Sequence, residues 1–143
     1  MTAKNNIVGS IELVNFPEFK MTDVPAKIDT GADTGALHCT KIEEIPSGKG
    51  SILRFSPFDH PEIIVQEDEF ITKHVRSSNG DATVRYFITT TITLQGKEFT
   101  IQLSLADRTE MKWPILIGKR FLQDNNFLVD VSRPAPVRYA EQD

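Results

Sequence analysis

The sequence predicts an all-β domain, and three observations support this. Stretches rich in β-branched and aromatic residues recur along the chain, separated by turns that contain Pro or Gly. Asn79-Gly80 stands between two long stretches of this kind and predicts a hairpin, because both residues accept positive φ. Only residues 118–126 read as helix, since they lack β-branched residues and follow the apolar run 115–117.

The expected elements follow in chain order. Strands are predicted at residues 7–14, 24–28, 36–45, 51–55, 70–76, 83–94, 98–105, 115–117 and 127–131. Gly9 is expected to form a bulge or a twist point within the first strand. Turns are predicted at residues 16–19, 46–50, 56–61, 77–81 and 95–97. Pro134 and Pro136 make 132–143 an irregular tail or an arm that reaches a partner.

Length and composition indicate a single domain over residues 1–143, with a core from about 7 to 131. A net charge of −4 gives no basic field, so a nucleic-acid partner is not expected. The sequence has no apolar run of membrane-spanning length and no apolar centre of a signal peptide near its start. We therefore expect no membrane partner and a cytoplasmic location, with a periplasmic one open if a leader has been removed.

The stretch Asp29-Thr30-Gly31 is the candidate functional loop. An apolar strand ends there and presents a carboxylate, and Gly31 allows another backbone to approach closely. The Thr30 hydroxyl can donate and accept hydrogen bonds, so it can hold such a loop together. The simpler alternative is an ordinary surface turn, since Asp, Thr and Gly all favour turns. A second motif favours a functional loop over an ordinary turn: Ile115-Leu116-Ile117-Gly118 and the helix after it can clamp a neighbouring loop.

Together, the two motifs resemble the retropepsin-type aspartic peptidases. The closest likeness is to their bacterial and archaeal relatives, a family named for ATP-dependent zinc proteases. The likeness covers residues 7–131 and includes Ala36-Leu37-His38, the hairpin between Arg76 and Arg85, and Asp107-Arg108. It implies a closed β-barrel with a flap hairpin and one short C-terminal helix.

The resemblance also implies a mechanism. One chain supplies half of an active site, so the active unit would be a homodimer in which two Asp29 carboxylates share one proton and activate a water. Thr30 would brace the two loops, and Gly31 would offer its backbone to the peptide substrate. No cofactor is required. The alternative is a peptide-binding module with this fold that lacks efficient catalysis.

The resemblance implies further site residues. Ala32 and Asp33 would contact substrate, while Ile117, Gly118 and Lys119 would support the loop. In retropepsins the acid at the position of Asp33 pairs with an arginine after the second glycine. Here that position is Lys119, which lacks the bidentate fork of arginine. A solvated turn carboxylate is the alternative for Asp33.

A second departure from the relatives is Gly35, where they usually carry a small hydroxyl residue.

The hairpin around Gly80 corresponds to the retropepsin flap, which closes over bound peptide. Arg76 and Arg85, nine residues apart around the turn, are expected to lie roughly opposite each other and to favour acidic or Glu-rich peptides. The family's association with ATP-grasp enzymes that add glutamate tails points the same way. The alternative is that these arginines only keep an exposed hairpin hydrated or hold it in place, without binding substrate.

The residues do not support the zinc and ATP of the family's name. The sequence has neither the phosphate-binding pattern Gly-x4-Gly-Lys-Ser/Thr nor His-Glu-x-x-His. His38 and Cys39 are neighbours on a strand, so they point to opposite faces and are not expected to share a metal. We expect polar histidines on or at the edge of a sheet, a small buried Cys39, and no metal site.

Overall fold

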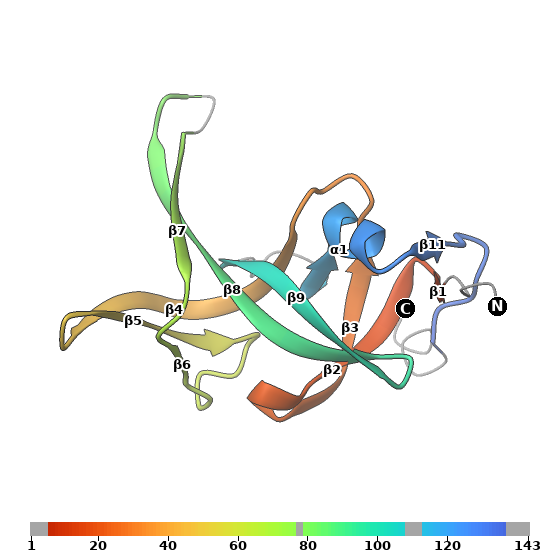
Figure 1. Ribbon diagram of the computed structural model, residues 1–143, viewed down its shortest axis with the longest axis horizontal. Coiled ribbons are helices and arrows are strands. Elements are labelled where there is room, and N and C mark those ends of the chain that lie inside the picture. Colours follow the sequence, from red (N-terminus) through yellow and green to blue (C-terminus); the bar gives the residue numbers. More distant parts are fainter. Residues whose placement is uncertain (1–5, 77–78, 108–112, 137–143) are drawn as a thin grey trace.

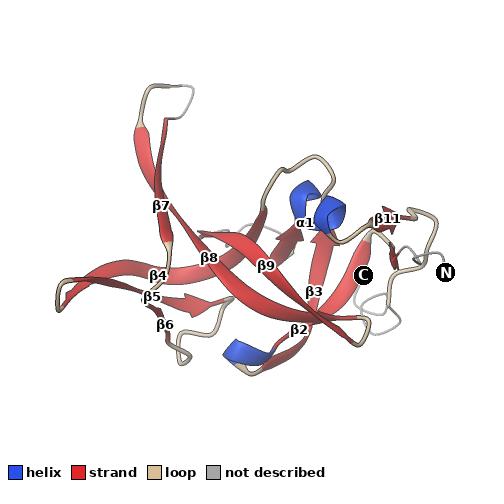
Figure 2. Ribbon diagram, viewed as in Figure 1, coloured by secondary structure: helices blue, strands red, loops and turns tan. Residues whose placement is uncertain are grey.

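The computed structural model describes residues 6–76, 79–107 and 113–136, and in this part of the chain six strands close into a barrel. Each strand pairs with the next around the ring, and β10 completes it by pairing with both β3 and β4. The barrel strands are β2 (Ile11–Phe16), β3 (Met21–Ile28), β8 (Ala82–Leu94), β9 (Lys97–Ala106), β4 (Gly35–Ser47) and β10 (Ile115–Ile117). The predicted closed β-barrel is confirmed (Figure 2).

The core fills the barrel because inward-facing positions alternate with exposed ones along the long strands. Leu37, Ile88, Leu103 and Ile117 are almost completely buried. A group of aromatic rings from η1 (Pro17–Phe19) and the neighbouring strands adds to this core, with Phe16 stacked 5.4 Å from Phe19.

The predicted first strand is wrong in one respect, because residues 7–14 form two strands. β1 (Asn6–Val8) leaves the barrel and pairs in parallel with β11 (Phe127–Val129), whereas β2 begins at Ile11. Gly9 marks the break: its N–H donates to the Glu12 carboxylate at 2.8 Å instead of to a strand. A side chain at Gly9 would also lie 3.1 Å from Cβ of Arg133.

Two hairpins extend from the barrel. β4 continues into a long hairpin with β5 (Gly50–Pro57), and β6 (Val65–Glu67) adds to the outer edge of β5. The sequence did not indicate β6, because the strand is only three residues long and two acidic residues and a phenylalanine follow it directly. β7 (Ile71–Arg76) pairs with β8 in the expected flap hairpin, which projects away from the barrel in Figure 1.

The second predicted hairpin is confirmed, since Leu94 pairs with Lys97 across Gln95-Gly96, and both turn residues have positive φ. The predicted helix is also confirmed, as the short α1 (Lys119–Asp124). It packs on the outside of the barrel through Phe121, whose ring lies 5.5 Å from that of Phe99. No helix in the described residues is long and apolar enough to cross a membrane.

Candidate active site

Asp29 is the first residue after β3, at the point where that strand leaves the barrel. Its backbone N–H donates to the carbonyl oxygen of Ile117 at 2.8 Å, which ties the loop to β10. Its carboxylate Oδ1 accepts the N–H of Gly31 at 3.0 Å. A Cβ on Gly31 would lie 3.4 Å from that same oxygen, at ordinary van der Waals contact. Asp29 is half-buried, whereas Thr30 and Gly31 are exposed.

The start of α1 holds the other end of the loop. The N–H of Lys119 donates to the Ala32 carbonyl at 2.7 Å, and the N–H of Arg120 donates to the Asp33 carbonyl at 3.0 Å. The first N–H groups of a helix have no partner within the helix, and Gly118 as N-cap offers no side chain to accept them. The loop after Asp29 therefore caps the helix, and the helix in turn fixes the loop.

Two glycines allow this close contact between loop and clamp. A Cβ on Gly118 would lie 2.7 Å from the Gly35 nitrogen, 2.7 Å from the Thr34 carbonyl carbon and 2.9 Å from the Asp33 oxygen. A Cβ on Gly35 would lie 2.2 Å from the Leu116 oxygen. At Gly35, where the relatives usually carry a small hydroxyl residue, β4 and β10 approach closely. A larger side chain there would fit only if the two strands moved apart. The packing role of Gly35 was missed, although a glycine inside a strand signals close backbone approach.

Asp33 and Lys119 form the brace that the resemblance implies, with lysine in place of arginine. Lys119 Nζ lies 3.3 Å from Asp33 Oδ1, and the side chains are 49% and 72% exposed. Such an exposed single contact contributes less than about 1 kcal/mol. The backbone hydrogen bonds that Ala32 and Asp33 accept from α1, at 2.7 and 3.0 Å, hold the loop in addition to this ion pair.

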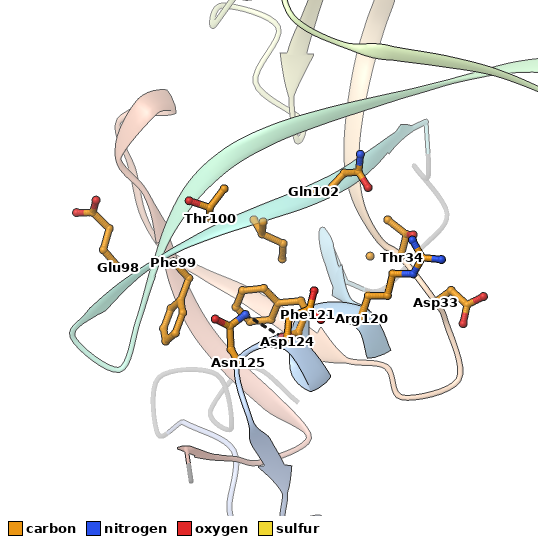
Figure 3. A pocket seen from close by; sticks show the side chains of 12 residues that line it. Asp33, Thr34, Glu98, Phe99, Thr100, Gln102, Arg120, Phe121, Asp124 and Asn125 are labelled. Atoms are coloured by element: carbon orange, nitrogen blue, oxygen red, sulfur yellow. Dashed lines mark hydrogen bonds between the residues drawn. The ribbon is translucent and has the colours of Figure 1, made fainter. Parts of the chain in front are cut away.

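A pocket of about 530 Å³ lies behind the loop, between α1 and β9. It is lined by Asp33, Thr34 and Gly35 rather than by Asp29. Figure 3 shows Arg120 extending along this pocket toward Thr34, a position that the sequence did not single out.

The flap carries basic residues, but not in the expected pairing. Arg76 pairs with Ala82, and Arg85 pairs with Lys73, so the two arginines do not lie opposite each other. The prediction failed because the strand pairing is centred on Asn79, which is three residues after Arg76 but six residues before Arg85. Gly80 lies in that turn with φ of 91°. The side chain of Arg76, residues 77–78 and Arg108 lie outside the described residues.

His38 and Cys39 lie side by side on β4, and both are buried. His38 Nε2 lies 2.8 Å from Asp59 Oδ1. Burial raises the pKa of the Cys39 thiol to about 12, an effect that a hydrogen bond with the Ala106 backbone partly offsets. Cys39 is therefore a neutral, buried thiol at physiological pH, as expected. Within the described ranges, no three His, Cys, Asp or Glu side chains gather as metal ligands.

Comparison with known proteins agrees with this geometry. A protein from Legionella pneumophila of unknown function has a crystal structure that superposes with a TM-score of 0.73, at 28% identity, covering 92% of this chain and 98% of that one. A probable alpha-L-glutamate ligase from Shewanella pealeana is 29% identical over 92% of this chain, and one from Desulfotalea psychrophila is 27% identical over 82%.

The chain spans only 30% and 26%, respectively, of those two curated relatives. The model of the RimB-like family, described as the retropepsin-like aspartic endopeptidase RimB, matches residues 7–137. This match includes the Asp29 loop, its clamp, the flap and the barrel. The chain therefore belongs to the RimB-like family of retropepsin-like proteins.

Proposed function

We propose that the protein is an aspartic endopeptidase that works as a homodimer, with Asp29 of each copy in one active site. The observation that carries this proposal is the Asp29 loop itself. Asp29 is half-buried, its carboxylate accepts the Gly31 N–H at 3.0 Å, and its backbone N–H donates to the Ile117 carbonyl of β10 at 2.8 Å. A group held by its own backbone in this way needs no reorganisation when substrate arrives.

A second copy is needed because one carboxylate cannot act as base and acid in the same step. Thr30 and Gly31 are exposed at the tip of the loop, where a second loop can meet them. The sheet of β1 and β11 offers further support for a dimer. Ile7 and Leu128 pair across it and are 44% and 52% exposed, so they form an adjacent apolar pair that a second copy can cover.

In the proposed reaction, the two Asp29 carboxyl groups share one proton, because two carboxyl groups in contact do not both ionise. The ionised group takes a proton from the water, whose oxygen attacks the peptide carbonyl carbon. The protonated group donates its proton to the carbonyl oxygen. When the tetrahedral intermediate collapses, the C–N bond breaks and the leaving nitrogen takes the proton held by the first carboxyl group. One hydroxyl of the intermediate returns its proton to the second carboxyl group, which restores the shared proton. No covalent enzyme intermediate forms.

Acidic or Glu-rich peptides are the proposed substrates. Lys73 and Arg85 pair across β7 and β8, so they lie on the same face of the flap, and both are exposed. Two adjacent cations on a surface with net charge −4 offer a local site for carboxylates. The relatives named as glutamate ligases contain a region similar to this chain, which is consistent with a glutamate-containing substrate.

The proposal is tested by incubating wild type and Asp29→Asn with poly-glutamate and neutral peptides from pH 3 to 8, with products identified by mass spectrometry. Asp23→Asn, at an exposed position near the start of β3, removes the same charge away from the Asp29 loop and from the pocket behind it, and serves as the matched control. We expect wild type and the control to cleave, and Asp29→Asn to lose at least 1,000-fold in rate. Equal cleavage by all three forms would exclude the aspartic mechanism. Peptide binding without cleavage by wild type would favour a peptide-binding module.

A further inference from the structure

A groove lies at the foot of the flap, outside the Asp29 loop. Two pockets of about 410 and 560 Å³ form it, and they share Glu18 and Glu67. One runs along η1 and residues 63–67, and the other runs from Glu67 to Ile71 against β8. Figure 1 shows β6, which borders both pockets, below the start of β7.

The groove exposes large apolar side chains. Ile64 is 62% exposed in one pocket, and Ile71 is 45% exposed in the other. Phe87, which pairs with Ile71 across the hairpin, forms a buried floor. Side chains of this kind at the two ends of a groove are suited to anchor a partner by burial of apolar surface.

The rim of the groove is strongly acidic. Glu18, Glu67, Asp68 and Glu69 line it, and the basic residues beside them are Lys20 and Lys73, the latter 4.9 Å above the Phe87 ring. Glu18 is fixed in place, because its Oε2 accepts from the Thr90 hydroxyl at 2.6 Å and from the Thr91 N–H at 2.8 Å.

The pKa of Glu67 is affected by the neighbouring acidic residues. Desolvation, followed by the charges of Glu18, Asp68 and Glu69, raises the pKa of its carboxyl. The carboxylates therefore repel one another, and a positive partner would relieve this repulsion.

The backbone of β6 completes the groove. Among the described strands, β6 pairs only with β5, so it forms the edge of the sheet. An edge strand presents backbone N–H and C=O groups to which an extended segment can bind as an added strand. Side chains of such a segment alternate between two faces. Basic side chains can then meet the acidic rim while apolar ones reach Ile64 and Ile71.

We propose that this groove docks an extended segment of a protein partner in which lysine or arginine alternates with apolar residues. The segment adds a strand to β6, its cations pair with the carboxylates of Glu67 and Asp68, and its apolar side chains cover Ile64 and Ile71. The groove is about two pockets long and partly apolar, features that suit a peptide rather than a metal ion. This docking site lies outside the Asp29 loop, and binding there does not depend on hydrolysis. It adjoins Lys73, one of the two cations proposed to bind substrate carboxylates.

The test measures fluorescence anisotropy of a labelled octapeptide, (Lys-Val)4, with the full chain at low ionic strength. We expect binding to wild type that weakens at least tenfold in a triple variant of the rim and about threefold in Ile64→Ser. The triple variant is Glu67→Gln, Asp68→Asn and Glu69→Gln, all exposed or half-buried positions whose change conserves shape. The (Glu-Val)4 peptide is the probe of opposite charge, and we expect it not to bind.

A matched triple variant removes three negative charges elsewhere on the surface: Glu43→Gln, Glu98→Gln and Asp124→Asn. It should change affinity by less than twofold, and Asp29→Asn should leave binding unchanged. Equal weakening by the two triple variants would show a general charge effect and overturn the proposal. Equal binding of (Glu-Val)4 would overturn it as well.

Two other occupants of the groove would each give a different result in the same samples. Stoichiometric displacement of the peptide by micromolar Ca²⁺ would assign the groove to a cation. Self-association that Ile64→Ser abolishes in sedimentation would assign it to a second copy. Either result would refute docking of a basic partner.

Discussion

Replacing Gly118 with alanine tests the contact between the Asp29 loop and its clamp. The added Cβ would lie 2.7 Å from the Gly35 nitrogen, 2.7 Å from the Thr34 carbonyl carbon and 2.9 Å from the Asp33 oxygen. All three atoms belong to backbone, so no flexible side chain can move aside. The loop has to separate from α1, which weakens the hydrogen bonds that Ala32 and Asp33 accept.

Overpacking of a tight site costs roughly 1–3 kcal/mol, and three backbone contacts place Gly118→Ala near the upper end, about 3 kcal/mol. For a chain of this length, such a loss lowers Tm by about 10 °C. Thermal unfolding by circular dichroism measures the shift, and peptide cleavage measures the effect on the loop.

Gly50→Ala is the matched control, because a Cβ there would meet no atom within 4 Å. A Tm for Gly118→Ala within 2 °C of wild type, or no larger a change than in the control, would refute the packing argument.

Three further predictions follow from other parts of the structure. Asp33→Asn should lower the free energy of unfolding by less than about 1 kcal/mol in urea titrations, because its ion pair with Lys119 is exposed; a larger loss would contradict this. Burial raises the pKa of Cys39 to about 12 from 9.0, so the unfolded chain loses the thiol proton first. Unfolding free energy should therefore fall more steeply above pH 9 in wild type than in Cys39→Val, by up to about 1.4 kcal/mol per pH unit, and parallel curves would refute it. Leu128→Asp, on the exposed face beside Ile7, should weaken the proposed dimer at least tenfold in sedimentation without lowering Tm in the monomer, and an unchanged dimer would exclude this face as the contact.

The sequence predicted the elements that have strong local signals. Asn79-Gly80 and Gln95-Gly96 mark hairpins because their backbones accept positive φ, and Ile115-Leu116-Ile117-Gly118 marks a buried strand followed by a helix. The two motifs also identified the loop and its clamp, which the structure places in direct backbone contact.

Other features depend on long-range contacts that no local pattern encodes. The division of residues 7–14 into two strands depends on β11, more than 110 residues later in the chain, which offers β1 a partner outside the barrel. The pairing of Arg85 with Lys73 depends on the register of the flap, which the turn length sets. The acidic groove joins Glu18 to Glu67 across separate elements, so it becomes visible only once the chain is folded.

The central claim is that two Asp29 carboxylates form one active site. The most direct measurement is their separation across a two-fold axis in a crystal structure of the protein bound to a non-hydrolysable peptide analogue. The account predicts carboxylate oxygens about 3 Å apart, with the analogue's hydroxyl between them and the flap closed above. A dimer that keeps the two Asp29 side chains more than roughly 10 Å apart, too far to share a proton, or a bound analogue on a monomer, would contradict it.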